Sequence, residues 1–210
     1  MNQLPAADPD RRPSLPSRLA HWVIFRIWKW QGWTIHGHAP EVPKAIVAGA
    51  PHSSNWDFVF FVGATHEESM EPGFLGKQTL FRGIMRKFMF DMGGVPVDRS
   101  RRANLTEQVA EAFDRVERLH LVIAPEGSRT SDGTWRSGFY HMARAANVPI
   151  IPVWVDNPNR RMGFGDPIDP QAPYSEVLLK IALFLRSHLP DFERYQVLER
   201  QALDLANEGR

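Results

Sequence analysis

The sequence of 210 residues contains no cysteine and no long uninterrupted hydrophobic run. The lack of cysteine excludes disulfide bonds, thiolate nucleophiles and cysteine-ligated zinc, and it fits a reducing compartment. The most apolar stretch, from about Leu19 to Trp33, contains Arg26 and Lys29 and is shorter than the ~18–20 apolar residues of a membrane-spanning helix. The first residues also lack the apolar segment and cleavage site of a secretory signal. We therefore expect a cytoplasmic protein without transmembrane segments.

The sequence also has little net charge. The formal charge is +1, from 25 basic and 24 acidic residues, which gives no basis for nucleic-acid binding. The hydrophobic fraction of 43% and the charged fraction of 23% are typical of a folded chain. We predict a flexible N-terminal arm at residues 1–17 and a single domain at residues 18–210. No H-E-x-x-H pattern or cysteine cluster supports a metal site.

A basic amphipathic helix is predicted directly after the arm. Its polar face carries Arg18, His21, Arg26 and Lys29, and its apolar residues are Trp22, Ile24, Phe25, Ile27 and Trp28. One interpretation is peripheral contact with an anionic membrane through Trp22, Phe25 and Trp28, because such helices lie in the headgroup layer. The other is docking on the protein core, and periodicity does not distinguish the two. The segment 80–90 is also cationic and amphipathic.

Apolar runs alternate with helical patterns along the rest of the chain. Buried strands are predicted at residues 45–50, 119–124 and 148–155, with shorter strands near 74–77 and before Asp98. Amphipathic helices lie between these strands, and further helices follow from about Ser175. This order predicts a single layered α/β domain with a mixed, mostly parallel sheet flanked by helices.

His52 and Asp57 lie five positions apart at a predicted strand-to-helix junction, in the sequence PHSSNWDF. A positioned histidine that deprotonates a hydroxyl group contributes ~10²–10⁴-fold to a rate, and a neighbouring carboxylate can hold its tautomer. A histidine and an aspartate at this spacing also occur by chance. Ser53 and Ser54 are interpreted as helix-capping hydroxyls.

Two arginine-containing loops follow apolar strands. The first is GGVPVDRS, with Arg99, and the second is PEGSRTSDG, with Glu126, Gly127, Ser128 and Arg129. Guanidinium groups in turns suit a phosphate monoester, because their paired donors match its oxygens. Lys77 and Arg136 are candidates for additional positive charge at such a site.

The order of these motifs resembles that of the phospholipid and glycerol acyltransferase family, including its 1-acylglycerol-3-phosphate acyltransferases. His52 and Asp57 match H-x-x-x-x-D, Gly93 and Arg99 match G-x-x-x-x-x-R, and 126–129 match E-G-T-R with serine in place of threonine. A VPIIP segment follows at 148–152. The resemblance covers residues 45–155, in a chain without the long hydrophobic N-terminal segments of many members.

The resemblance implies the family's α/β fold and transfer of a fatty-acyl group from acyl-CoA or acyl carrier protein, without a cofactor. The acceptor would be the hydroxyl of a lysophospholipid or glycerol phosphate. His52 would act as the base and Asp57 as its partner. The groups around the acceptor would be Arg99, Glu126, Gly127, Ser128 and Arg129, with Lys77 nearby. The protein would work peripherally on the inner face of the cell membrane.

Two other functions remain open from the sequence. A non-enzymatic lipid-binding protein would keep the basic helices and would function without His52. A lipid or thioester hydrolase would use Ser53 or Ser54 as nucleophile, but the chain has no G-x-S-x-G motif.

Overall fold

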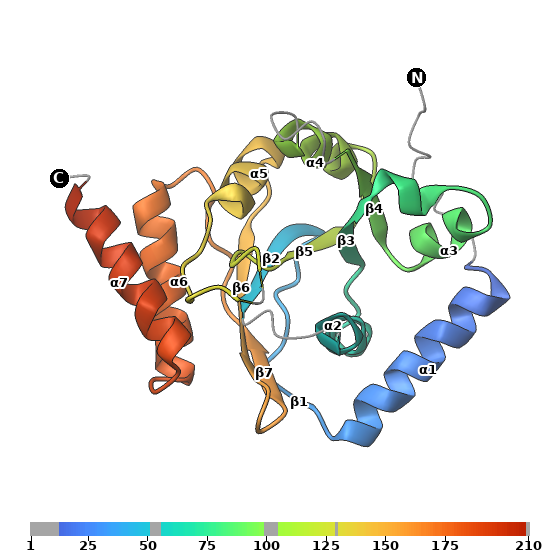
Figure 1. Ribbon diagram of the computed structural model, residues 1–210, viewed down its shortest axis with the longest axis horizontal. Helices are drawn as coiled ribbons and strands as arrows, with labels where there is room; N and C mark the ends of the chain where they lie inside the picture. Colours follow the sequence, from blue (N-terminus) through green and yellow to red (C-terminus); the bar gives the residue numbers. More distant parts are fainter. Residues whose placement is uncertain (1–12, 51–55, 99–104, 129, 209–210) are drawn as a thin grey trace.

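The computed structural model describes residues 13–50, 56–98, 105–128 and 130–208, with the backbone alone for residues 56–59. These residues form one seven-stranded sheet in the order β1-β7-β6-β2-β5-β3-β4 (Figure 1). The strands are β1 (Thr34–His36), β2 (Lys44–Ala50), β3 (Pro72–Lys77), β4 (Gly94–Val97), β5 (Leu119–Ile123), β6 (Ile150–Asp156) and β7 (Arg161–Phe164). Strands β6 and β7 are antiparallel, and the other neighbours are parallel. The predicted mixed, mostly parallel α/β sheet is confirmed.

Helices cover both faces of this sheet. They are α1 (Leu15–Gln31), α2 (Trp56–Glu67), α3 (Met85–Asp91), α4 (Leu105–Asp114), α5 (Gly138–Ala146), α6 (Tyr174–His188), α7 (Glu193–Glu208) and the 3-10 helix η1 (Gln78–Phe81). Helices α1 and α2 lie on one side of the sheet, and α4, α5, α6 and α7 lie on the other (Figure 1). The short η1 and α3 lie beside β3 and β4.

Strand β2 shows why the sheet is buried on both faces. Ile46, Ala48 and Ala50 join a core cluster with residues of α4, α5, α6 and α7, whereas Val47 joins a second cluster with residues of α1 and α2. This alternation follows from the two-residue period of a strand. A parallel strand covered on both faces reads as a continuous apolar run, which is why the sequence reveals it.

Helix α1 begins at Leu15, earlier than the expected domain start at residue 18. The Ser14 side chain accepts a hydrogen bond from the backbone N–H of Ser17, 3.4 Å away, and so caps the helix. The helix ends at Gly32, whose φ of 72° is left-handed. None of the described helices combines the length with the apolar character that crossing a bilayer requires.

One face of α1 packs on α2, so the helix is not wholly available to lipid. Trp28 is fully buried, its indole N–H donates to Glu67 at 2.8 Å, and its ring stacks on Trp33. A Cβ atom added at Gly63 of α2 would lie 2.6 Å from Trp28 Cγ, so this glycine permits the close approach. Phe25 is partly buried in the same contact. The expected membrane contact through Trp28 is therefore wrong.

Strand β7 is absent from the sequence prediction. Its four residues, RMGF, are too few to show a period, and its pairing depends on the turn that follows β6. In that turn the Asp156 carboxylate accepts hydrogen bonds from the Asn159 backbone N–H at 3.2 Å and the Arg161 guanidinium at 2.6 Å. These bonds close the β6–β7 hairpin, which adds the antiparallel pair.

Candidate functional site

The predicted site residues divide into those that the structure describes and those that it does not. His52, Arg99 and Arg129 lie outside the described residues, and Asp57 lies in the first turn of α2, where only the backbone is described. The predicted residues with described side chains are Lys77, Glu126, Ser128 and Arg136, and Gly127 is also described. The roles assigned to all of them remain predictions.

The sheet topology brings together the ends of the four strands that precede or contain the predicted site residues in the sequence. Strands β2, β5, β3 and β4 are successive parallel neighbours, so their carboxyl ends lie on the same side of the sheet (Figure 1). Ala50 ends β2 two residues before His52, and Ile123 ends β5 three residues before Glu126. Lys77 and Val97 are paired at the ends of β3 and β4. This edge is where ligands bind in open α/β sheets.

An apolar cavity of about 380 Å³ lies at the same edge. It is enclosed by α2 on one side and by the central strands on the other. Its lining includes Trp33, Gly49, Phe60, Ala64, Val122 and Met162. Asn157 is the one polar side chain among the described lining residues. The volume falls in the ~300–1,000 Å³ range of small-molecule sites, and the lining suits an apolar ligand.

The turn after β5 is held by buried contacts. The Glu126 side chain is fully buried and forms an ion pair with Arg194 of α7, with 2.7 Å between Oε2 and Nη1. Gly127 has a left-handed φ of 72°, and a Cβ atom there would lie 3.2 Å from Arg136 Nε. The Gly127 N–H donates to the Ala124 carbonyl at 3.1 Å. Glu126 is therefore held by α7, three residues before Arg129.

The sequence does not predict a role for Arg194, because this residue belongs to no recognisable motif. It lies 68 positions after Glu126, and only the packing of α7 brings the two together. An arginine near the start of a predicted helix is most often exposed, so its position in the sequence gives little reason to expect an ion pair with a buried carboxylate.

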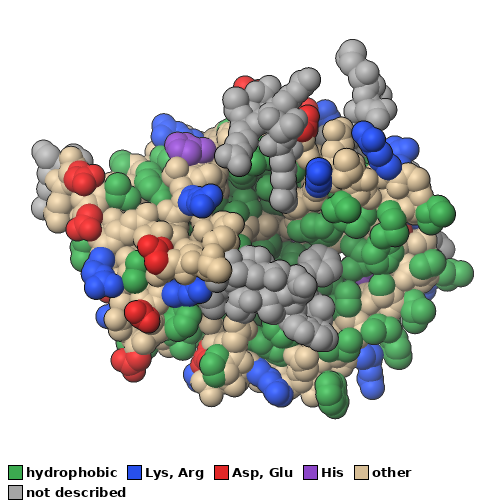
Figure 2. All heavy atoms as spheres, viewed as in Figure 1, with side chains coloured by type: hydrophobic (Ala, Val, Ile, Leu, Met, Phe, Trp, Pro, Cys, Tyr) green, Lys and Arg blue, Asp and Glu red, His purple; other side chains and the backbone are tan. Residues whose placement is uncertain are grey.

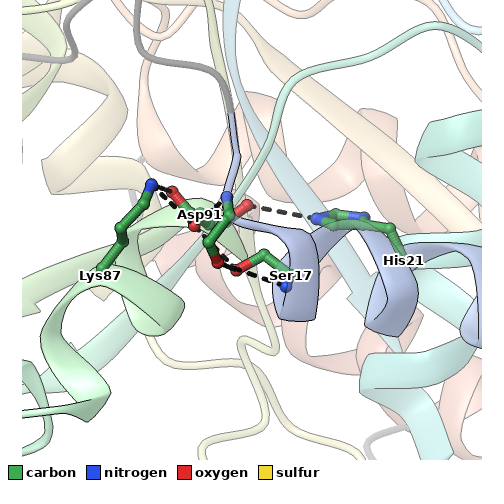
Figure 3. Close-up of polar contacts among 5 residues, drawn as sticks. Ser17, His21, Lys87 and Asp91 are labelled. Carbon is green, nitrogen blue, oxygen red and sulfur yellow. Dashed lines mark hydrogen bonds and ion pairs between the residues drawn. The ribbon is translucent and has the colours of Figure 1, made fainter.

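A polar cluster around Asp91 ties α1 to α3 (Figure 3). The Asp91 carboxylate accepts hydrogen bonds from the Ser14 backbone N–H at 3.0 Å, the Ser17 hydroxyl at 2.8 Å and Lys87 Nζ at 3.0 Å. The His21 ring lies 3.2 Å from the Asp91 carbonyl oxygen. Burial by itself raises the pKa of Asp91, but these hydrogen bonds outweigh it and lower the pKa to about 2.

Replacing Asp91 with asparagine should lower the free energy of unfolding by about 2 kcal/mol at neutral pH, the equivalent of the pKa difference. The folded pKa lies below the ordinary value of 3.8, so the contribution is complete above pH 3.8 and is lost as the pH falls through 2. Urea unfolding from pH 7 to pH 3 measures this. Asp114→Asn, at an exposed carboxylate of α4, is the control. A gap between wild type and Asp91→Asn that stays constant at low pH would contradict the assignment.

The outer side of α1, η1 and α3 carries exposed apolar side chains, which we call the α1–α3 apolar surface. They are Leu15, Leu19, Trp22, Val23, Trp30, Leu80, Ile84 and Met85. Trp30 is 84% exposed and Ile84 is 98% exposed. Exposed arginines lie among them at positions 18, 26, 82 and 86. Figure 2 shows hydrophobic and basic side chains gathered on the side of the molecule where α1 and α3 lie.

Comparison with known proteins gives consistent matches. The Acyltransferase family model matches residues 33–156. The 1-acyl-sn-glycerol-3-phosphate acyltransferase of Salmonella typhimurium is 27% identical over 118 residues, which are 54% of this chain and 47% of that protein. The Escherichia coli enzyme of the same name is 26% identical over the same shares. The chain thus spans about half the length of the curated relatives it matches.

A solved structure matches over more of the chain. The crystal structure of the 1-acyl-sn-glycerophosphate (LPA) acyltransferase PlsC from Thermotoga maritima superposes with a TM-score of 0.55. The match covers 90% of this chain and 79% of that one, at 18% sequence identity. At this identity the likeness establishes the fold.

Proposed function

The chain belongs to the acyltransferase family, and on that basis we propose that it transfers a fatty-acyl group to a glycerolipid hydroxyl. The donor is a thioester, either acyl-CoA or acyl carrier protein, and the acceptor is a lysophospholipid or glycerol phosphate. The observation that carries the proposal is the apolar cavity of about 380 Å³ at the edge where β2 and β5 end. Such a cavity favours an acyl chain, because each buried CH₂ group contributes ~0.8 kcal/mol.

In the proposed reaction, His52 removes the proton of the acceptor hydroxyl as its oxygen attacks the thioester carbonyl. The new C–O bond forms, the C–S bond breaks, and the thiol leaves with the proton from His52. Asp57 holds the imidazole in the required tautomer and stabilises the imidazolium. Helix α2 begins at Trp56, between the two residues, so its first N–H groups are suited to stabilising the oxyanion. The transfer uses no cofactor and no acyl-enzyme.

We assign the phosphate of the acceptor to Lys77, Arg99 and Arg129. Lys77 is exposed at the end of β3, and its partner in register, Val97, lies two residues before Arg99. Gly127 and Ser128 form the turn that leads to Arg129. The arginine forks bind phosphate oxygens in pairs, and the lysine adds charge.

The same proposal includes peripheral attachment to the anionic inner face of the cell membrane through the α1–α3 apolar surface. Trp22 and Trp30 supply amphipathic rings, and Arg18 and Arg26 supply positive charge on the same helix. The segments 15–31 and 78–90 contain no acidic residue, so their charge complements anionic lipid. The Asp91 cluster supports this arrangement, because it holds α1 beside α3.

Ile84→Ser should weaken binding to vesicles of phosphatidylcholine and phosphatidylglycerol by about tenfold, since burying such a side chain contributes about 1.5 kcal/mol or more. Ile84 is 98% exposed, so its loss leaves the fold intact. Co-sedimentation measures the binding. Leu183→Ser, at a 51% exposed leucine of α6 on the other side of the sheet, should bind like the wild type. Equal weakening by both variants would count against a defined membrane surface.

Assay of the purified chain with labelled acyl donors tests the proposal. Acyl-CoA and acyl carrier protein are each offered with a panel of lysophospholipids and glycerol phosphates, and products are separated by chromatography. We expect an acylated glycerolipid from at least one pair, and the best pair defines the donor and acceptor. Free fatty acid without an acylated product would indicate a hydrolase. Lipid binding without any product would indicate a non-enzymatic role.

A further inference from the structure

Helix α7 contacts the end of β2, which precedes the His52 motif, and Glu126 of the second arginine-containing loop, although it lies outside the part of the chain that matches the family. The family match ends at residue 156, and α7 spans Glu193–Glu208. Its inner face is in the core, where Tyr195, Leu198 and Ala202 are fully buried. This packing fixes the position of the neighbouring polar residues of α7.

Tyr195 holds the end of β2. Its hydroxyl donates to the Ala50 carbonyl oxygen at 2.7 Å and accepts from the Val155 backbone N–H at 3.2 Å. Ala50 and Trp154 are partners in the pairing of β2 with β6, so the hydroxyl bridges the ends of two adjacent strands. Burial, with Glu126 and Asp156 nearby, raises the pKa of Tyr195, so the hydroxyl keeps its proton. The Ala50 carbonyl group, two residues before His52, is therefore fixed in position.

Arg194 holds the turn after β5. Its guanidinium forms the ion pair with Glu126 at 2.7 Å, and the Glu126 side chain is fully buried. A carboxylate in this state depends on its partner, because an uncompensated buried charge is costly. The pair fixes the backbone three residues before Arg129.

The loop beyond Arg129 is also held by α7. A Cβ atom at Gly133 would lie 2.8 Å from the Arg194 Cα atom, so the loop and the helix backbone are in direct contact. The Gln201 side chain accepts from the Trp135 N–H and donates to the Trp135 carbonyl, both at 2.9 Å. The helix thus contacts the described chain both before Arg129, at Glu126, and after it, at Gly133 and Trp135.

We propose that α7 is a positioning element of the active site, in which Tyr195 orients the segment that carries His52 and Arg194 orients the segment that carries Arg129. This inference rests on the proposed acyl transfer. The two residues touch no reacting atom and act through Ala50 and Glu126. Their effects should therefore separate, with Tyr195 acting on the chemical step and Arg194 on the acceptor.

The test compares kcat and the acceptor KM of two variants in the acyl-transfer assay, well below their unfolding temperatures. Tyr195→Phe keeps the ring and removes the hydroxyl, and it should lower kcat by up to about 10²-fold with little change in KM, since displacement of about 1 Å has effects of this size. Arg194→Met should mainly raise the acceptor KM. Arg194→Lys keeps the positive charge and should raise the acceptor KM less. If Arg194→Met does not fold, Arg194→Lys against wild type gives the same comparison.

Matched controls separate positioning from general loss of stability. Tyr140→Phe removes another buried tyrosine hydroxyl that donates to a carbonyl, that of Ala172 at 3.0 Å. Arg200→Met removes an exposed arginine from α7 itself. Both should keep wild-type kcat and KM. If Tyr195→Phe and the Arg194 variants also keep wild-type values, the positioning role is wrong although the transferase function stands. If the wild type makes no product, the proposed function fails and the positioning role fails with it.

Discussion

His52→Ala is expected to reduce acyl transfer by about 10²–10⁴-fold, the usual contribution of a positioned general base. A glycerol hydroxyl is a weak nucleophile near neutral pH, and its attack on the thioester requires removal of its proton as the C–O bond forms. The strand β2 ends at Ala50 and α2 begins at Trp56, so His52 lies in the sequence between these two elements. The measurement is the initial rate of product formation from the best donor and acceptor.

The control for this variant is His38→Ala, because the His38 side chain is 93% exposed and lies before β2. It should retain the wild-type rate. Vesicle binding by His52→Ala should also match the wild type, which separates loss of chemistry from loss of attachment. Undiminished product formation by His52→Ala would show that another group is the base, and Ser54→Ala would then test a serine nucleophile.

The fold class is readable from the sequence because its central strands are buried on both faces. Such strands give continuous apolar runs, as at residues 45–50 and 150–154, and the helices between them give a clear period. The antiparallel strand β7 gives no such run, since RMGF has only four residues. Its pairing comes from side-chain bonds of Asp156 within the turn, which no hydrophobic pattern encodes.

The orientation of α1 shows a second limit of prediction from the sequence. Trp22, Trp28 and Trp30 are similar in a sequence, yet Trp28 is buried and the others are largely exposed. What decides between them is Gly63 of α2, which lets the Trp28 ring approach the α2 backbone. The hydrophobic period identifies the helix and its apolar face. What that face packs against depends on Gly63, which is 35 positions away from Trp28.

In the candidate site, too, the sequence predicts the features that depend on adjacent residues but not those that depend on distant ones. The motif residues around Glu126 are adjacent in the sequence, and their left-handed turn at Gly127 is a local requirement for glycine. The contacts of Arg194 and Tyr195 with the same edge come from the far end of the chain. They depend on the packing of α7 into the core, so no motif predicts them.

If the chain performs the proposed transfer, Gly49→Val is expected to shift its preference toward shorter acyl chains. Gly49 lines the apolar cavity, and a Cβ atom added there would meet only Val153, at 3.6 Å from its Cβ atom, which is an ordinary contact. The added Cβ atom is thus accommodated, and the three carbons of valine are expected to take space from the ligand. At ~0.8 kcal/mol per excluded CH₂ group, kcat/KM should fall about 50-fold for a chain that fills the cavity.

A series of acyl donors from short to long measures this, with kcat/KM plotted against chain length for wild type and variant. Short chains should react as they do with the wild type, which makes them an internal control for His52 three residues away. Gly138→Val is the matched substitution elsewhere, because nothing lies within 4 Å of the added Cβ atom there. If Gly49→Val slows all chain lengths equally, the cavity does not hold the acyl chain, and the donor must bind elsewhere on the edge of the sheet.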